Sequence, residues 1–209
     1  MYLFIRSGQM QRERALEALT FATEICGEVE KVTGVEVHAW SVLYGDEINN
    51  VSWTARAESH AAMGAISAKL QADAGYMART AQAAELFTTA PIDTFAEVLA
   101  TVNETDALGT YSSVVMAQCA AGKIAEAMAW GVDIFNHVGK VTGRPGLFIR
   151  SLYGPWASLA WVALADTLEE VDAATTAMSS DPGYIEMIDQ AGDLFLPGSG
   201  QSRLSQRIA

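Results

Sequence analysis

The sequence has few cysteines, few basic residues and no long apolar run, and each shortage excludes a class of protein. Two cysteines without CxxC spacing, Cys26 and Cys119, favour buried free thiols over a disulfide framework or a zinc site. No stretch of about 18 uncharged apolar residues could cross a bilayer as a helix. Thirteen Lys and Arg against 25 Asp and Glu give a net charge of -12, which repels nucleic-acid phosphates and anionic lipids. We therefore expect no nucleic-acid partner and no membrane partner.

The common motifs of cofactor and hydrolase chemistry are also missing. The chain contains no GxGxxG between a strand and a helix, no Walker lysine loop, no HExxH, no Cys/His cluster and no GxSxG elbow. No haem or flavin motif is present either, so we expect neither a cofactor nor a metal. The N-terminus lacks the charged and then apolar pattern of a signal peptide, which indicates a cytoplasmic protein.

Half of the residues are apolar and 18% are charged, which is enough to bury a sizeable core. The sequence also contains an internal repeat, so that two similar units follow one another along the chain. Val29, Lys31, Val32, Thr33 and Gly34 return as Val138, Lys140, Val141, Thr142 and Gly143. Further along, Trp53 corresponds to Trp161, and the Asp-Ala-Gly-Tyr segment at 73–76 corresponds to Asp-Pro-Gly-Tyr at 181–184. We expect one unit at 1–101, a linker at 102–110 and a second unit at 111–209.

Each repeat is predicted to run strand, helix, two strands, helix, strand. An apolar stripe at helical spacing indicates the first helix, and Gly34 and Gly143 stand where a left-handed residue would end it. Ser59 and Thr167 are N-cap candidates for the second helix, and the Asp-x-Gly-Tyr segments restart it. The expected strands are 2–7, 35–44, 50–58 and 93–101 in the first repeat, and 111–117, 146–153, 158–166 and 201–208 in the second.

A duplicated βαββαβ unit that carries this Asp-x-Gly-Tyr helix start resembles the dimeric α+β barrel superfamily of ferredoxin-like domains. The resemblance implies an α+β fold in which the antiparallel sheets of two tandem ferredoxin-like units pair into one barrel, with an interior that could hold one small ligand. Relatives include cofactor-free antibiotic-biosynthesis-type monooxygenases, cyclases, haem-degrading enzymes and stress-related NIPSNAP-like proteins. The haem-binding residues of such relatives cannot be placed on this sequence. A monomer would complete the pairing, and a homodimer remains open.

Polar residues found in only one repeat are the candidates for function. Ser52, Thr54 and Arg56 alternate along a predicted strand with Val51, Trp53 and Ala55, so they would point into the barrel if Trp53 faces the helices. The second repeat has Ala160, Val162 and Leu164 at these places. The interior would therefore be polar on one side and apolar on the other, which suits an amphipathic ligand. The alternative is that Arg56 is merely solvated at a strand end.

His38 is the candidate general base, because histidine titrates near neutral pH. Its counterpart is Leu147, and either His38 or Arg150 would look inward, since the aligned strands put them on opposite faces. A satisfied core histidine is the alternative. Tyr44 ends the same strand beside a turn glycine, where its ring would either have a structural packing role or stand at the mouth of a pocket.

Charged residues on the last strands complete the set of candidates. Glu97 in the first repeat aligns between Arg203 and Arg207 of the second, and Glu97 is the expected partner of an inward-facing Arg56. His60 and His137 stand at helix ends and are expected to be solvated. The leading hypothesis is a small-molecule-binding barrel that acts as a cofactor-independent oxygenase or cyclase on an apolar or aromatic metabolite. The alternative is a ligand-binding or stress-related protein without turnover.

Overall fold

The computed structural model describes residues 1–45, 48–105 and 108–209. Residues 46–47, and 106–107 of the expected linker, lie outside the described residues. The elements in chain order are β1 (Tyr2–Gln9), η1 (Arg12–Arg14), α1 (Ala15–Thr33), β2 (His38–Gly45), β3 (Asn50–Ala57), α2 (His60–Ala72), α3 (Ala74–Ala81), η2 (Gln82–Glu85), β4 (Ile92–Val102), β5 (Tyr111–Gln118), α4 (Ile124–Thr142), β6 (Gly146–Tyr153), β7 (Ser158–Ala165), α5 (Leu168–Ser180), α6 (Pro182–Gln190) and β8 (Gln201–Arg207).

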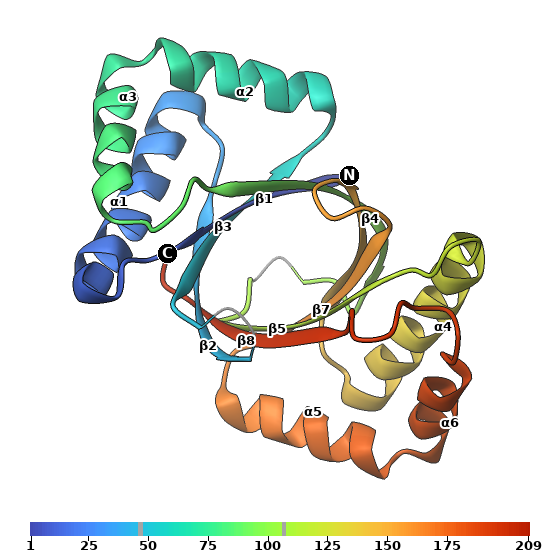
Figure 1. Cartoon of the computed structure of the whole chain (residues 1–209). Coiled ribbons are helices and arrows are strands. Elements are labelled where there is room, and N and C mark those ends of the chain that lie inside the picture. The colour runs from blue at the N-terminus through green and yellow to red at the C-terminus, as the bar shows by residue number, and fades with distance from the viewer. Residues whose placement is uncertain (46–47, 106–107) are drawn as a thin grey trace. The chain divides into compact units, whose positions relative to one another are not determined.

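The element order confirms the expected α+β fold. The strands are hydrogen-bonded in the closed order β1-β3-β2-β8-β5-β7-β6-β4, which is that of an eight-stranded α+β barrel. In each half of the chain the helices cover one face of the strands (Figure 1). The second strand begins at His38 and not at 35, because the Val35 amide donates to the Thr33 hydroxyl and is held at the end of α1. None of the described helices is long and apolar enough to span a membrane.

The chain forms two compact units whose bounds differ from those of the sequence repeats. Unit 1 comprises residues 1–96 and 206–209, and unit 2 comprises residues 97–205. Strand β4 begins in unit 1, where Asp93 is ion-paired with Arg6 of β1, and continues into unit 2. Strand β8 begins in unit 2, and the residues after it, Ile208 and Ala209, exchange backbone hydrogen bonds with Ala39 of β2 in unit 1.

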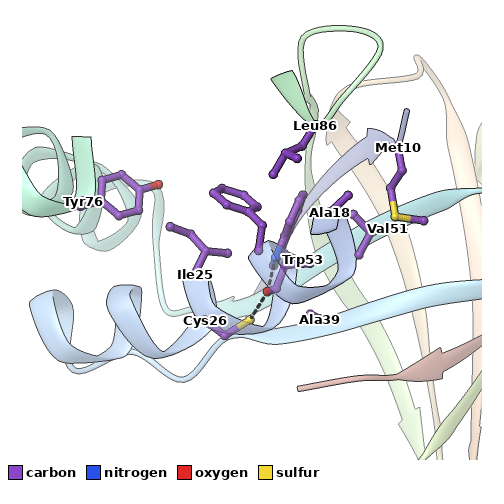
Figure 2. Packing of buried hydrophobic residues seen from close by; sticks show 11 residues of the cluster. Met10, Ala18, Ile25, Cys26, Ala39, Val51, Trp53, Tyr76 and Leu86 are labelled. Carbon is purple, nitrogen blue, oxygen red and sulfur yellow. Dashed lines mark hydrogen bonds between the residues drawn. The ribbon is translucent and has the colours of Figure 1, made fainter. Parts of the chain in front are cut away.

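The core of unit 1 forms where α1 packs on β3. Trp53 is 8% exposed, and its indole N–H donates to the Ala22 carbonyl of α1 at 3.0 Å. The Cys26 thiol donates to the same carbonyl at 3.3 Å (Figure 2). Burial raises the pKa of Cys26 to about 11, so this cysteine is a protonated core residue, as the sequence predicts.

Unit 2 repeats this contact with different packing volumes. The Trp161 indole donates to the Gly131 carbonyl of α4, again at 3.0 Å. Gly131 takes the place of Ala22 because the fully buried Phe148 ring lies against it, and a Cβ atom there would collide with that ring. Unit 1 carries Ala39 where unit 2 has Phe148, so each unit pairs a larger residue with a smaller one to fill the same space.

The two hairpins also match, and one of them is strained. Asn49 in the β2–β3 hairpin and Ala157 in the β6–β7 hairpin have positive φ angles of 75° and 54°. Their carbonyls accept equivalent backbone bonds from Met10 and Cys119. Asparagine tolerates the left-handed region, whereas alanine pays about 1 kcal/mol or more to enter it. Unit 2 therefore holds a strained residue where unit 1 does not.

We expect Ala157→Asn to raise the free energy of unfolding by about 1 kcal/mol, because asparagine relieves the cost of the left-handed conformation. Urea denaturation followed by tryptophan fluorescence measures this change. The reciprocal control is Asn49→Ala, which loses both the tolerated conformation and the bond from Asn49 Nδ2 to the Met10 carbonyl at 2.6 Å, so it should destabilise the protein. Lower stability of Ala157→Asn would contradict the interpretation.

Candidate functional site

The sheet of unit 1 presents one face to its helices and a second face, here called the helix-free face, that bears Thr54. Because Trp53 meets α1, its neighbours on β3, Ser52, Thr54 and Arg56, stand on the helix-free face. Strand β1 adds Leu3, Ile5 and Ser7 to that face, since these residues pair directly with Arg56, Thr54 and Ser52. The alternation expected from the sequence is therefore present, with apolar side chains beside the polar ones.

His38 belongs to the same face, which settles the parity of β2. It pairs directly with Thr54, and Trp40 pairs with Ser52. The buried Trp40 indole donates to the Thr54 hydroxyl at 3.0 Å, so this threonine is held in one orientation. Sequence reasoning did not select Trp40, although its shared parity with His38 was the available signal.

The electrostatic surroundings of His38 keep its imidazole neutral at neutral pH. The side chain is 19% exposed, and burial is the main reason why its pKa lies below the ordinary value. Arg207 and Arg56 lower this pKa further, whereas Glu36 and Glu30 raise it. The carboxylate of Glu36, Oε1, lies 3.6 Å from Nε2 of the imidazole. Arg207, near the end of β8, thus belongs to the surroundings of the candidate base.

Arg56 is the exposed charged residue of this site. Within the described part of the chain its side chain makes no hydrogen bond and no ion pair, and it reaches His38 only through the field described above. An exposed guanidinium without a carboxylate partner can still bind an anion.

The corresponding face of unit 2 is mostly apolar, with Ser112 of β5 beside Leu164. Trp161 faces α4, so Ala160, Val162 and Leu164 stand on the opposite side of β7. Leu147 and Ile149 of β6 pair directly with Val162 and Ala160. The second copy of the fold therefore forms without any of the polar residues that unit 1 carries.

Glu97 has a different partner from the one expected. The structure pairs it with Arg150, whose Nε and Nη2 both lie 2.7 Å from Oε2 of the carboxylate. Arg150 shares a face of β6 with Phe148 on the helix side, because it pairs with buried Leu159. The expected Arg56–Glu97 pair is therefore wrong, since β6 lies beside β4 and supplies a nearer cation.

Arg6 forms a further ion pair on the helix side of unit 1 that sequence reasoning missed. Its Nε and Nη2 bind the two carboxylate oxygens of Asp93 at 2.7 and 2.8 Å. Beside this fork the rings of Tyr2, His60 and Phe95 pack with centroid separations of 4.7 to 5.2 Å. His60 is exposed, as expected, but it is not merely solvated, because its imidazole also packs against these rings. The Arg6 guanidinium is already paired with a carboxylate, so we assign this cluster a structural role.

His137 is likewise not a solvated helix-end residue. Its Nε2 lies 2.6 Å from Oδ1 of Asp181, the residue that caps α6 by accepting the Tyr184 amide at 2.6 Å. The bond to His137 is the main cause that lowers the pKa of Asp181. Glu28 occupies the corresponding position in unit 1, where Asp73 caps α3 without a histidine. This contact joins α4 to α6 and is structural.

Two further candidates stand on β2 and β8. Tyr44 at the end of β2 is 66% exposed, and Arg203 lies on β8 in unit 2. Among the described residues, no group of three or more His, Cys, Asp or Glu side chains is placed to hold a metal ion. The arrangement that the structure brings together is His38, Ser52, Thr54 and Arg56, with Trp40 and Arg207 added.

The comparisons with known proteins show the fold. No family model matches the chain, and no curated protein matches it. A candidate monooxygenase from Fusobacterium nucleatum subsp. nucleatum has a similar structure, with a TM-score of 0.73, 7% identity and coverage of 100% of this chain and 92% of that one. An anthrone oxidase-like protein matches with a TM-score of 0.72, 13% identity and coverage of 100% and 91%.

A third similar structure is a major regulator of staphylococcal pathogenesis. Its TM-score is 0.57 at 9% identity, and the match covers the whole of both chains. The chain therefore has the dimeric α+β barrel fold that these structures share. One fold is found in proteins described as enzymes and in one described as a regulator, so the site and not the fold must carry the argument for function.

We expect the imidazole of His38 to titrate below the ordinary histidine pKa of about 6.5. Arg56→Leu removes a cation and should raise this pKa, whereas Glu36→Gln removes an anion and should lower it further. Proton–carbon NMR of the imidazole Cε1 group over a pH series measures the midpoint. The control Arg12→Leu removes an exposed arginine that is not among the charges acting on His38. A shift of the midpoint in Arg12→Leu as large as in Arg56→Leu would contradict a local effect.

Proposed function

We propose that the helix-free face of unit 1 binds a small, largely aromatic molecule and that His38 removes a proton from it. The observation that supports this best is a neutral, half-buried imidazole whose pKa is lowered mainly by burial and further by Arg207 and Arg56. The two guanidinium groups also favour a negative charge on a ligand next to His38. A base and an anion-stabilising pair are thus part of one arrangement.

The chemistry that follows is the ionisation of a phenol or of an enolisable carbon acid. His38 takes the proton on a ring nitrogen, and the electron pair that is left on the ligand forms a phenolate or enolate whose oxygen is stabilised by Arg56. In a cyclase this carbanion attacks a carbonyl carbon of the same molecule. In a cofactor-independent oxygenase the carbanion reduces dioxygen, which is co-substrate and oxidant, and a carbon–oxygen bond forms. The resulting peroxide takes the proton back from His38 and loses water, so one oxygen atom stays on the ligand as a carbonyl and the other leaves as water.

The side chains around His38 favour an aromatic ligand with one oxygen-bearing edge. Leu3, Ile5 and Trp40 supply apolar contact area on the same face, and Ser52 and Thr54 supply hydroxyls. The resemblance to an anthrone oxidase-like protein and to a candidate monooxygenase is compatible with this class of ligand, although it rests on fold alone.

The alternative function is ligand binding without turnover, as in a stress-related or NIPSNAP-like protein. It is favoured by the presence of a single titratable base on this face, where an enzyme usually brings two such groups together. The regulator with the same fold supports it by analogy. Both functions use the same face, so substitutions there separate them.

We expect His38→Leu, which installs the residue of the second repeat, to abolish dioxygen uptake with anthrone as probe while leaving anthrone binding within about threefold. The reason is that leucine keeps the apolar volume and removes the base. Uptake by the unaltered protein should rise with pH as His38 loses its proton, with a midpoint below about 6.5. An oxygen electrode and quenching of tryptophan fluorescence measure the two properties.

Arg56→Leu, again the residue of the second repeat, should weaken binding of the anionic ligand by about tenfold or more and leave the fold intact. The control Arg12→Leu also removes one positive charge, but from η1, and it should change neither ligand binding nor the fold. Binding that is lost in Arg56→Leu without any uptake in the unaltered protein supports the non-catalytic alternative. If Arg56→Leu binds the ligand as well as Arg12→Leu does, a site on this face is refuted.

A further inference from the structure

A groove lies on unit 2 between the end of α5 and the length of α6. Its volume is about 580 Å³. Ile185 lines it and is 46% exposed, and Ile188, three residues further along α6, is 42% exposed. The remaining lining residues are Ser179, Ser180, Asp181, Pro182, Glu186, Asp189 and Gln190. Two large aliphatic side chains are thus left in contact with water beside a hollow.

The charges around the groove have one sign. Residues 151–202 contain no Lys and no Arg, so every charged group that α5 and α6 contribute is a carboxylate. Asp181 is already engaged by His137 and by the α6 backbone, whereas Glu186 is bonded only weakly, to Gln190 at 3.4 Å. Glu186 and Asp189 therefore set a negative field along an apolar strip formed by the two isoleucines.

The fold does not need this surface. In unit 1 the positions of Ile185, Glu186 and Asp189 are occupied by Met77, Ala78 and Ala81. The contacts that hold α6 are different ones, namely the Asp181 cap and the bond from the Trp130 indole to the Met187 carbonyl at 2.9 Å. Met77, the counterpart of Ile185, is exposed to the same extent. The two carboxylates and Ile188, whose counterpart is Thr80, therefore distinguish unit 2 on a helix that is already anchored.

We propose that this groove docks a basic amphipathic helix of a partner protein. An apolar face fits the isoleucine strip, and lysine or arginine side chains at its flanks pair with Glu186 and Asp189. The charge complementarity selects this occupant, because a second copy of this acidic chain or an anionic membrane would be repelled by the same carboxylates. The proposal concerns unit 2 and is independent of the chemistry assigned to His38.

The experiment uses the full chain and a synthetic helical peptide with leucines on one face and lysines on the other. Isothermal titration calorimetry compares it with a peptide of identical composition whose leucines and lysines are scrambled around the helix. We expect the amphipathic peptide to bind at least about tenfold more tightly than the scrambled one, with an affinity that falls as salt rises.

Matched variants locate the binding. The double variant Glu186→Ala with Asp189→Ala carries the two alanines that unit 1 has at these positions. It should bind the amphipathic peptide about tenfold more weakly than the unaltered protein. Glu169→Ala with Asp172→Ala removes the same charge from the first half of α5 and should change affinity by less than about twofold. Absence of peptide binding, equal binding of the scrambled peptide, or equal loss in the two double variants would overturn the proposal.

Discussion

A single hydrogen bond, from a strand tryptophan to a helix carbonyl, determines which residues each unit can offer for function. In unit 1 the Trp53 indole reaches Ala22, and in unit 2 the Trp161 indole reaches Gly131, both at 3.0 Å. An indole N–H that is buried must find an acceptor, so β3 and β7 cannot shift by one residue without losing both this bond and the packing of the ring. Thr54 and Val162 are thereby placed on the face that carries no helix.

The charged groups of unit 1 differ in whether they are already paired. Arg6 is neutralised by both carboxylate oxygens of Asp93, and Arg150 in unit 2 is neutralised by one carboxylate oxygen of Glu97. Arg56 and Arg207 act instead on an imidazole that burial has already made reluctant to take a proton. The carboxylates that act on His38 are Glu36, which is 75% exposed and weakened by water, and Glu30, and a ligand anion next to His38 would compete with these two.

The element order, the caps and the parity of β3 could be predicted from the sequence because they depend on local periodicity that occurs twice. Gly34 and Gly143 end their helices with φ of 76° and 68°, Ser59 and Thr167 cap α2 and α5, and new helices start after Asp73 and Asp181, all as expected. The ion pairs could not be predicted, because Glu97 meets Arg150 only once β4 lies beside β6. Arg207 approaches His38 for a similar reason, since the end of the chain bonds to β2.

A fused pair of repeats has a freedom that a homodimer of one repeat lacks. Identical subunits present every substitution twice, so a polar residue that serves one copy must be tolerated in the other. Here the helix-free face of unit 1 has gained His38 and Arg56 while unit 2 keeps Leu147 and Leu164. The helices differ in the opposite sense, because unit 2 carries Glu186 and Asp189 where unit 1 has alanines. Trp53 and Trp161 make the same packing contact in both units, so these differences surround an unchanged core.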